Sequence, residues 1–364
     1  MRALHKAFEA TWAAGGQVDI ELDRIREYVG NTPNHLVGIE FKLAINATTA
    51  NAETIYLQEL WGALQNVVLT DIADIEVLRG NGQMLSQLMR CVRGDVEPDD
   101  GTHTGDGNAD DFVIRARVPF CGGSEGIPGF AFKDFIQPMS RFKDGLLHVD
   151  FSAADAITNV TINSATLYVS FEGLPYAPAR QGMDIRYKQT TYPDGQKVIF
   201  PVHGEAVLAA CVANADWDHS DYTVFTEPEM GYMTNVNLFQ LVDAFNAACA
   251  GTRDDAYLVE ASPQIAPLVF PQRDLGANGL VYPSSKWEWE ITNTNQATHR
   301  IMWAEIHSMQ GNGGLPALMT SKAEGIYRGR IPAEPKFMDN NRQSVGGLRR
   351  RRLDAILSRE LILR

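Results

Sequence analysis

The side chains with the clearest catalytic chemistry are two glutamates in a short aromatic stretch. Glu288 and Glu290 flank Trp289 in the segment KWEWEIT. Residues two apart on a strand face the same side, so both carboxylates would share one sheet face and the indoles of Trp287 and Trp289 the other. A β-sandwich glycosidase needs two carboxyl groups facing each other across a groove. A half-exposed strand with core aromatics has the same pattern, so this segment leaves both interpretations open.

Two acidic stretches contain residue types that bind metal ions. The loop 95–111 reads DVEPDDGTHTGDGNADD, and residues 216–221 read DWDHSD. The calcium-loop spacing is absent, because counting from Asp106 places Asp111 at the sixth position and Arg117 at the twelfth, where glycine and glutamate are required. The second stretch has no defined ligand spacing. Solvated surface loops are favoured in both cases, and we expect no metal or cofactor.

Sequence motifs of common enzyme classes are missing. The chain has no GxxxxGK[ST], HExxH, GxSxG or His-x-His sequence, and its eight histidines are scattered. The formal net charge of −13 argues against binding nucleic acid over the whole surface. We therefore expect a protein that is not an enzyme and has no direct contact with nucleic acid.

Length and composition indicate a soluble globular protein with room for two domains. The chain has 364 residues, of which 45% are hydrophobic and 21% charged. The cysteines are far apart in the sequence, which favours thiols as small core residues in a reducing compartment; they are Cys91, Cys121, Cys211 and Cys249. Glu9 interrupts the N-terminal stretch, which is therefore not expected to be a signal peptide.

Alternating hydrophobic residues predict long strands in the first half. Between Asp111 and Pro119, apolar side chains alternate with Val113, Arg115 and Arg117, and the two arginines are expected to face out of the sheet at a subunit interface. A Gly-rich excursion, CGGSEGIPG, precedes a second alternating strand, which is typical of a Greek key or jelly roll. The predicted inward residues are Val37, Ile39, Phe41, Leu43, Ile45, Phe112, Ile114, Ala116, Val118, Leu147, Val149 and Phe151.

The second half has the same style, with one predicted helix near 236–249. Its apolar stripe has helical spacing, and Gly251 lies just beyond its end. Short strands are predicted at 198–202, 206–212, 222–225, 256–260, 267–270, 286–292 and 300–309.

Each end of the chain is predicted to carry a helix. Residues 1–16 form an amphipathic segment with an apolar face, ending at Gly15 and Gly16. It could pack on its own domain, on a neighbour or on lipid. Residues 336–364 form a basic helical tail, whose arginines could meet lipid headgroups, acids of adjacent subunits or DNA. The residues expected at an inner or membrane face are Leu4, Phe8, Trp12, Arg349, Arg350, Arg351, Arg352 and Arg359.

These elements predict an all-β protein with two tandem eight-stranded jelly-roll β-sandwich barrels and short terminal and inserted helices. A jelly roll takes roughly 130 to 180 residues, so two fit the chain. We place the first barrel at 17–175, a connection at 176–196 and the second barrel at 197–335.

The sequence resembles the double jelly-roll major capsid proteins of tailless icosahedral phages with an internal membrane, of tectivirus type. The segments that carry the resemblance are HLVGIEFKLAINATT, VIRARVPFCGG, LLHVDF and ATLYVSFEGLP, with NGLVYPSSKWEWEITNTNQATHRIMWAEIHSM in the second half.

The resemblance implies a homotrimer that forms a pseudo-hexagonal capsomer in a shell over a membrane. Implied partners are other copies of the chain, minor capsid and vertex proteins, and lipid on the inner face. The implied location is the virion, after synthesis in the host cytoplasm. A carbohydrate-binding or glycoside-hydrolysing β-sandwich is the alternative, and a receptor-binding spike is a third hypothesis.

Overall fold

Strands dominate the computed structural model, in agreement with the predicted all-β class. It describes residues 3–4, 8–93, 101–122, 127, 132, 135–175, 183–196, 198–199, 206–214, 222–227, 232–237, 264–268, 288–292 and 298–308.

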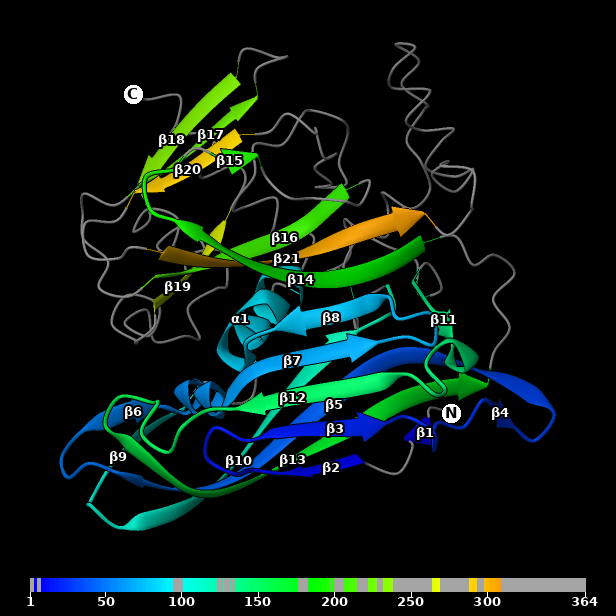
Figure 1. The fold of residues 1–364 in the computed structure, drawn as a ribbon, viewed down its shortest axis with the longest axis horizontal. Coiled ribbons are helices and arrows are strands. Elements are labelled where there is room, and N and C mark those ends of the chain that lie inside the picture. The colour runs from blue at the N-terminus through cyan, green and yellow to red at the C-terminus, as the bar shows by residue number, and fades with distance from the viewer. Residues whose placement is uncertain are drawn as a thin grey trace.

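The first half is a sandwich whose outer layer is a sheet built on three long strands. Strands β13 (Val160–Pro175), β5 (Thr32–Thr49) and β10 (Ala109–Pro119) lie side by side in that order, and both contacts are antiparallel. Figure 1 shows this layer at the bottom of the molecule. Four short strands extend its margins: β1 (Ala3–Leu4), β2 (Phe8–Thr11), β4 (Tyr28–Val29) and β11 (Gln137–Pro138).

The facing layer is an eight-stranded sheet that runs through both halves of the chain. Its order is β19-β16-β21-β14-β8-β7-β12-β3. The halves meet where β14 runs parallel to β8, with Tyr187 opposite Leu78. First-half members are β3 (Gln17–Glu21), β12 (Leu146–Phe151), β7 (Leu64–Thr70) and β8 (Glu76–Gly80), and second-half members are β14 (Met183–Pro193), β16 (Ala206–Asn214), β19 (Gln264–Leu268) and β21 (Thr298–Ser308).

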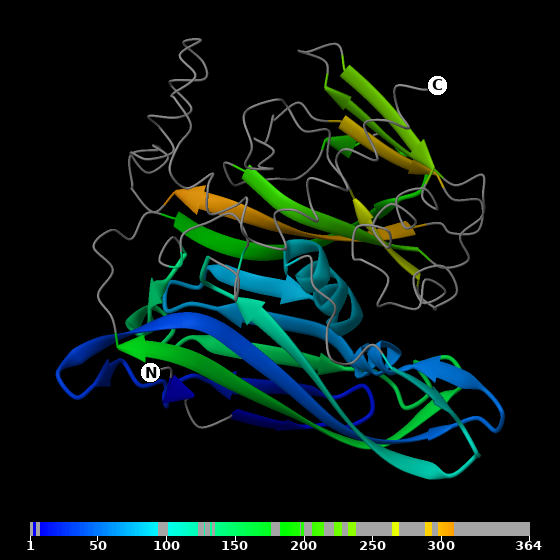
Figure 2. The same ribbon diagram turned by 180° about the vertical axis from the view of Figure 1, so that it is seen from behind.

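A four-stranded sheet in the order β15-β20-β17-β18 forms a further layer over the second half, as the reverse view also shows (Figure 2). Its strands are β15 (Val198–Ile199), β17 (Tyr222–Glu227), β18 (Tyr232–Asn237) and β20 (Glu288–Thr292). A two-stranded ribbon, β6 (Thr54–Tyr56) with β9 (Thr102–Thr104), completes the described sheets.

Alternation along the long strands correctly predicts which side chains face the main core, with one exception. Ile39, Phe41 and the other inward residues of β5, β10 and β12 are buried, apart from the half-buried Phe112 at one end of β10. The exception is Val37. The pairing with β13 shifts register between Glu172 and Gly173, so Leu36 joins the main core and Val37 packs in a small cluster with Cys121.

Helix α1 (Gly82–Arg93) is an element that the sequence analysis missed. Asn81 caps it, because the Asn81 Oδ1 accepts a hydrogen bond of 3.0 Å from the backbone N–H of Gln83. The helix follows β8 of the first half yet packs against β16 and β21 of the second. The core is therefore continuous through both halves. Two 3-10 turns, η1 (Leu57–Ala63) and η2 (Met139–Arg141), lie elsewhere in the first half.

Three predicted elements are corrected by the structure. Residues 3–4 and 8–11 form strands β1 and β2 instead of an N-terminal helix. Strand β18 extends to Asn237, so the predicted helix does not start at 236, and residues 238–249 lie outside the described residues. The predicted connection 176–196 contains the eleven-residue strand β14, which begins the second half.

Candidate functional site at the junction of the two halves

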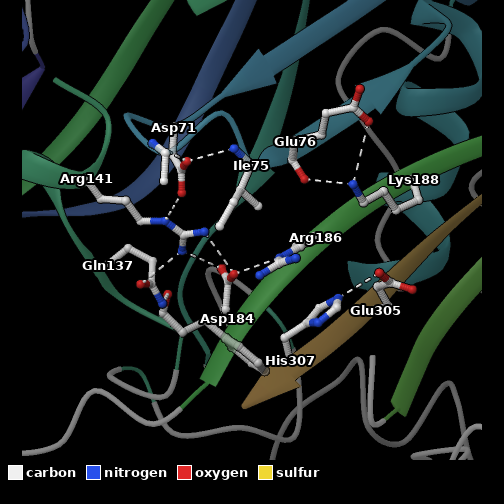
Figure 3. Close-up of polar contacts among 12 residues, drawn as sticks. Asp71, Ile75, Glu76, Gln137, Arg141, Asp184, Arg186, Lys188, Glu305 and His307 are labelled. Atoms are coloured by element: carbon white, nitrogen blue, oxygen red, sulfur yellow. Dashed lines mark hydrogen bonds and ion pairs between the residues drawn. The ribbon is translucent and has the colours of Figure 1, made fainter. Parts of the chain in front are cut away.

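A buried ionic cluster joins the two halves of the chain (Figure 3). Arg141, at the end of η2 in the first half, donates from Nε to Asp71 Oδ2 at 2.8 Å. Its two terminal nitrogens donate to the carboxylate of Asp184 on β14, at 2.9 and 3.0 Å. Arg186 donates to the same carboxylate at 2.9 Å. One guanidinium therefore bridges carboxylates from both halves.

Local backbone geometry fixes the first carboxylate. Asp71 directly follows β7 in the turn to β8, and its Oδ1 accepts hydrogen bonds from the backbone N–H groups of Ala73 and Ile75, both at 2.9 Å. Asp74 in this turn has a positive φ of 58°, a conformation that aspartate tolerates better than most residues. The second oxygen of Asp71 is thereby aimed at Arg141, because the first is held by the turn.

The cluster is buried and electrostatically matched. The side chain of Asp71 is 3% exposed, that of Asp184 is 0% exposed and that of Arg141 is 11% exposed. Burial acts to lower the pKa of Arg141, but its hydrogen bonds and charge interactions with Asp184 and Asp71 outweigh burial and raise that pKa. The guanidinium of Arg141 thus stays charged, and its nitrogen atoms donate hydrogen bonds to both carboxylates.

Other side chains of β14 extend the junction along the sheet. Lys188 donates to the backbone oxygen of Glu76 at 2.8 Å, and burial lowers the pKa of Lys188. The Gln189 side chain accepts the backbone N–H of Asn81 at 2.7 Å. The Tyr187 hydroxyl donates to the Pro119 carbonyl at 2.6 Å, inside the core. Together these contacts hold β14 to two segments of the first half, residues 76–81 and the end of β10 at Pro119.

The contacts at this junction hold the two halves of the chain together. Within the described residues, no three His, Cys, Asp or Glu side chains are grouped so as to hold a metal ion. His307 and Trp303 both contact the buried carboxylate of Glu305, at 2.7 and 2.9 Å, and His299 contacts Asp194 at 2.7 Å. These polar groups satisfy one another, so they stabilise the second half as pairs.

The two arginines predicted at a subunit interface differ in their surroundings. Arg117 forms an ion pair with Glu172 of β13 across the intervening strand β5, and both side chains are largely buried. Gly38 makes room for this pair, since a Cβ there would lie 3.0 Å from both charged groups. Arg115 is 60% exposed and lies 3.8 Å from Glu40. Both arginines lie on the face of β10 that alternates with its buried residues, as predicted, and of the two only Arg115 is mostly exposed.

The predicted inner-face residues do not form an exposed helical stripe. Phe8 is buried and packs edge-on against Phe171, and the Trp12 indole donates to the Ser152 carbonyl. Phe8 belongs to the core of the first half and the partly buried Trp12 packs against that core, so these two side chains pack on their own domain. Leu4 pairs with Glu172 as part of β1. The arginines of the tail, 349–352 and 359, lie outside the described residues.

The acidic candidates are only partly described. Glu288 and Glu290 lie on β20 opposite Thr226 and Val224 of β17, with one residue between them, so the backbone places them on one face as predicted. In the loop 95–111, Asp106 accepts hydrogen bonds from Asn108, which lower the pKa of Asp106. The segment 216–221 lies outside the described residues.

Comparison with solved structures relates this whole architecture to viral coat proteins. The chain from the atomic structure of Sulfolobus turreted icosahedral virus matches with a TM-score of 0.55 at 13% identity, covering 97% of this chain and 99% of that one. The crystal structure of the STIV MCP matches with a TM-score of 0.54 at 12% identity, covering 88% and 98%. The chain shares the fold of a viral major capsid protein. The major capsid protein P2 of bacteriophage PM2 matches with a TM-score of 0.49 at 11% identity, covering 86% and 100%.

The double jelly-roll fold is shown by structure and not by sequence. No protein-family model matches the chain, and no curated protein matches its sequence. None of the helices among the described residues is long and apolar enough to cross a membrane.

The junction residues were absent from the sequence-based candidates. Asp71, Arg141 and Asp184 are separated by 70 and 43 positions, so no local motif connects them. The available signals were indirect. Asp71 is followed by a turn. Asp184 lies on β14, and its charged side chain is fully buried there.

Proposed function

We propose that this chain is the major capsid protein of an icosahedral virus. The observation that carries the proposal is the fold match over 97% of this chain and 99% of the STIV chain, because it includes both halves and their junction. The buried cluster around Arg141 supports the same function, since a shell subunit must hold its two barrels at a constant angle.

The subunit forms a homotrimer in this proposal. Three subunits of two barrels each place six similar units around one axis, which makes a pseudo-hexagonal capsomer that can tile a shell. The shell encloses an internal membrane and also contains minor capsid and vertex proteins. The protein is made in the host cytoplasm and resides in the virion.

Arg115 contributes to the contact between subunits. It lies on β10, which forms the end of the sheet order β1-β13-β5-β10, and its side chain is 60% exposed. Val113, on the same face of β10, is 54% exposed. An exposed cation beside an exposed apolar residue on a terminal strand suits a protein interface with a polar rim.

The test is the mass and shape of the purified full-length chain. We expect light scattering to give the mass of three chains and negative-stain images to show hexagonal tiles. A monodisperse monomer under all conditions would overturn the capsomer proposal.

A matched pair of variants tests the interface. We expect Arg115→Glu to weaken the trimer, while Arg24→Glu, whose side chain is 74% exposed near β4, leaves it intact. Equal trimer stability in the two variants would remove Arg115 from the interface.

A further inference from the structure

Exposed apolar side chains gather at one end of the first half, next to the ionic junction. Tyr28 is 54% exposed, Ile72 is 58% exposed and Leu146 is 37% exposed. They are three of the five large hydrophobic residues that are exposed in the described part of the chain; the others are Val113 and Phe132. An exposed apolar cluster of this kind often marks a surface that another segment covers.

Three segments, 21–28, 72–74 and 143–146, carry these side chains and are bonded together. The Leu22 N–H donates to the Gly145 carbonyl at 3.0 Å, and the Ile72 N–H donates at 3.0 Å to the carbonyl of Arg141, two residues before the third segment. Lys143 forms an ion pair with Glu27 at 2.7 Å. Figure 1 places the β7–β8 turn, the start of β12 and β4 at the same end. We call this surface the end patch.

The end patch is apolar in its exposed side chains and acidic in its charge. The three segments contain five acidic and three basic residues, a difference of −2: Glu21, Asp23, Glu27, Asp74 and Asp144 against Arg24, Arg26 and Lys143. Anionic lipid attracts basic surfaces, so this sign disfavours a lipid surface as the partner. It favours a basic, amphipathic protein segment.

The chain itself supplies such a segment close by. Strand β21 ends at Ser308, which pairs with Met183, next to the Asp184 that binds Arg141. The described chain therefore ends beside the end patch, and residues 309–364 follow it. Thirty-nine residues, 309–347, precede the stretch LRRRRLDAILSRELILR. A random-coil chain of that many residues has an end-to-end distance of roughly 35 Å, so the length of this stretch allows a return to the patch.

The sequence of this C-terminal segment complements the patch. From 348 to 364 it has six arginines and two acids, opposite in sign to the patch. Its helical spacing places four aliphatic residues on one side: Leu353, Ile356, Leu357 and Leu361. A helix of about this length is marginal in water unless its apolar side is covered.

We propose that residues 348–364 dock as a helix on the end patch of their own chain. The aliphatic stripe covers Tyr28, Ile72 and Leu146, and the arginines face the surrounding acids. This contact goes beyond the capsid role, because it exists in the isolated subunit whether or not shells form.

Limited trypsin digestion of the full-length chain tests the docking. Arg349–Arg352 offer a cluster of cleavage sites that docking protects. We expect Ile72→Asn to speed cleavage there by about tenfold, as expected for losing the burial of one large aliphatic side chain. Val113→Asn is the matched control, because Val113 is similarly exposed on another surface, and it leaves the cleavage rate unchanged. Equal rates in wild type and Ile72→Asn overturn the proposal.

Reciprocal changes in the segment exclude an effect of Ile72 on folding. Leu357→Asn lies on the aliphatic stripe and is expected to speed cleavage like Ile72→Asn, while Ser358→Asn on the other side is not. Protection that grows with protein concentration would overturn docking within one chain in favour of a second copy. Protection that needs phosphatidylglycerol vesicles would overturn it in favour of a membrane. A chain that fails to form trimers yet shows the expected cleavage pattern contradicts the capsomer proposal alone.

Discussion

Replacing Arg141 by methionine is the sharpest test of the junction. Methionine keeps much of the aliphatic volume but removes the charge that Asp71 and Asp184 share. Both carboxylates stay buried, at 3% and 0% exposure. Asp71 retains two backbone N–H donors, and Asp184 retains Arg186. The variant therefore leaves two buried charges with incomplete compensation.

The expected loss follows from that geometry. Removing one partner of a buried ion pair costs about 3–5 kcal/mol, because the remaining charge is left in a poorly solvated site. Arg186 is more exposed, at 22%, and its carboxylate partner keeps Arg141. We expect Arg186→Met to cost about 1 kcal/mol, within the range for hydrogen bonds and partly exposed ion pairs.

Urea unfolding of Arg141→Met, Arg186→Met and the wild type measures these losses by linear extrapolation. Arg141→Lys adds a third comparison, because lysine keeps the charge but cannot bind Asp184 through two parallel hydrogen bonds, and it should fall between methionine and arginine. A loss below about 1 kcal/mol for Arg141→Met, or equal losses for both methionine variants, would refute the assignment of Arg141 as the main bridge.

Further predictions address pH, backbone packing and the core. The pKa of His148 is raised above 6.5, chiefly by its hydrogen bond with Asp19 and, against the opposing effect of burial, also by Asp150. Its stabilisation is therefore complete below pH 6.5 and lost as the pH rises through the folded-state pKa, so His148→Gln should lose more stability in acidic than in alkaline buffer; equal losses would contradict this. Gly82→Ala should cost about 1–3 kcal/mol in urea unfolding, because its Cβ would lie 2.4 Å from the Trp61 carbonyl oxygen. Gly80→Ala meets the flexible end of Met302 at the same distance and should cost less; the reverse order would show that the helix start adjusts more easily than the core. Phe151→Asp would bury an unpaired charge in the first core and should yield no soluble folded protein; a soluble trimer would show that this strand face is misassigned.

Strands with one buried face were predictable from sequence because burial imposes a period of two. In β10 and β12 the alternation of side chains such as Ile114 and Val149 matches the observed burial. Side-chain spacing did not distinguish a helix from a strand at the N-terminus. Leu4, Phe8 and Trp12 are spaced by four, which satisfies both a helical face and one side of a strand. Pairing with β13 decides the outcome, and that partner is more than 150 residues away.

The junction itself could not be read from the sequence. Arg141 follows Met139 in a short turn that resembles many surface turns, and its role depends on Asp71 and Asp184 from two other segments. Helix α1 was more accessible. Asn81 is a common capping residue, and Met84, Leu85, Leu88 and Met89 follow at helical spacing. Gly80 and Gly82 on either side of Asn81 also favour a turn, and this signal obscures the start of the helix in the sequence.

Helix α1 is synthesised well before the strands of the second half that cover it. It is complete at Arg93, but its partner strand β16 ends at Asn214, 121 residues later, and β21 follows later still. At about 5–20 residues per second, the ribosome needs roughly 6–24 s to synthesise that interval. During this time the apolar side of α1 that β16 will cover is open to chaperones and to other nascent chains. Slowing translation between the two halves should therefore lower the yield of folded subunit, although it changes no residue.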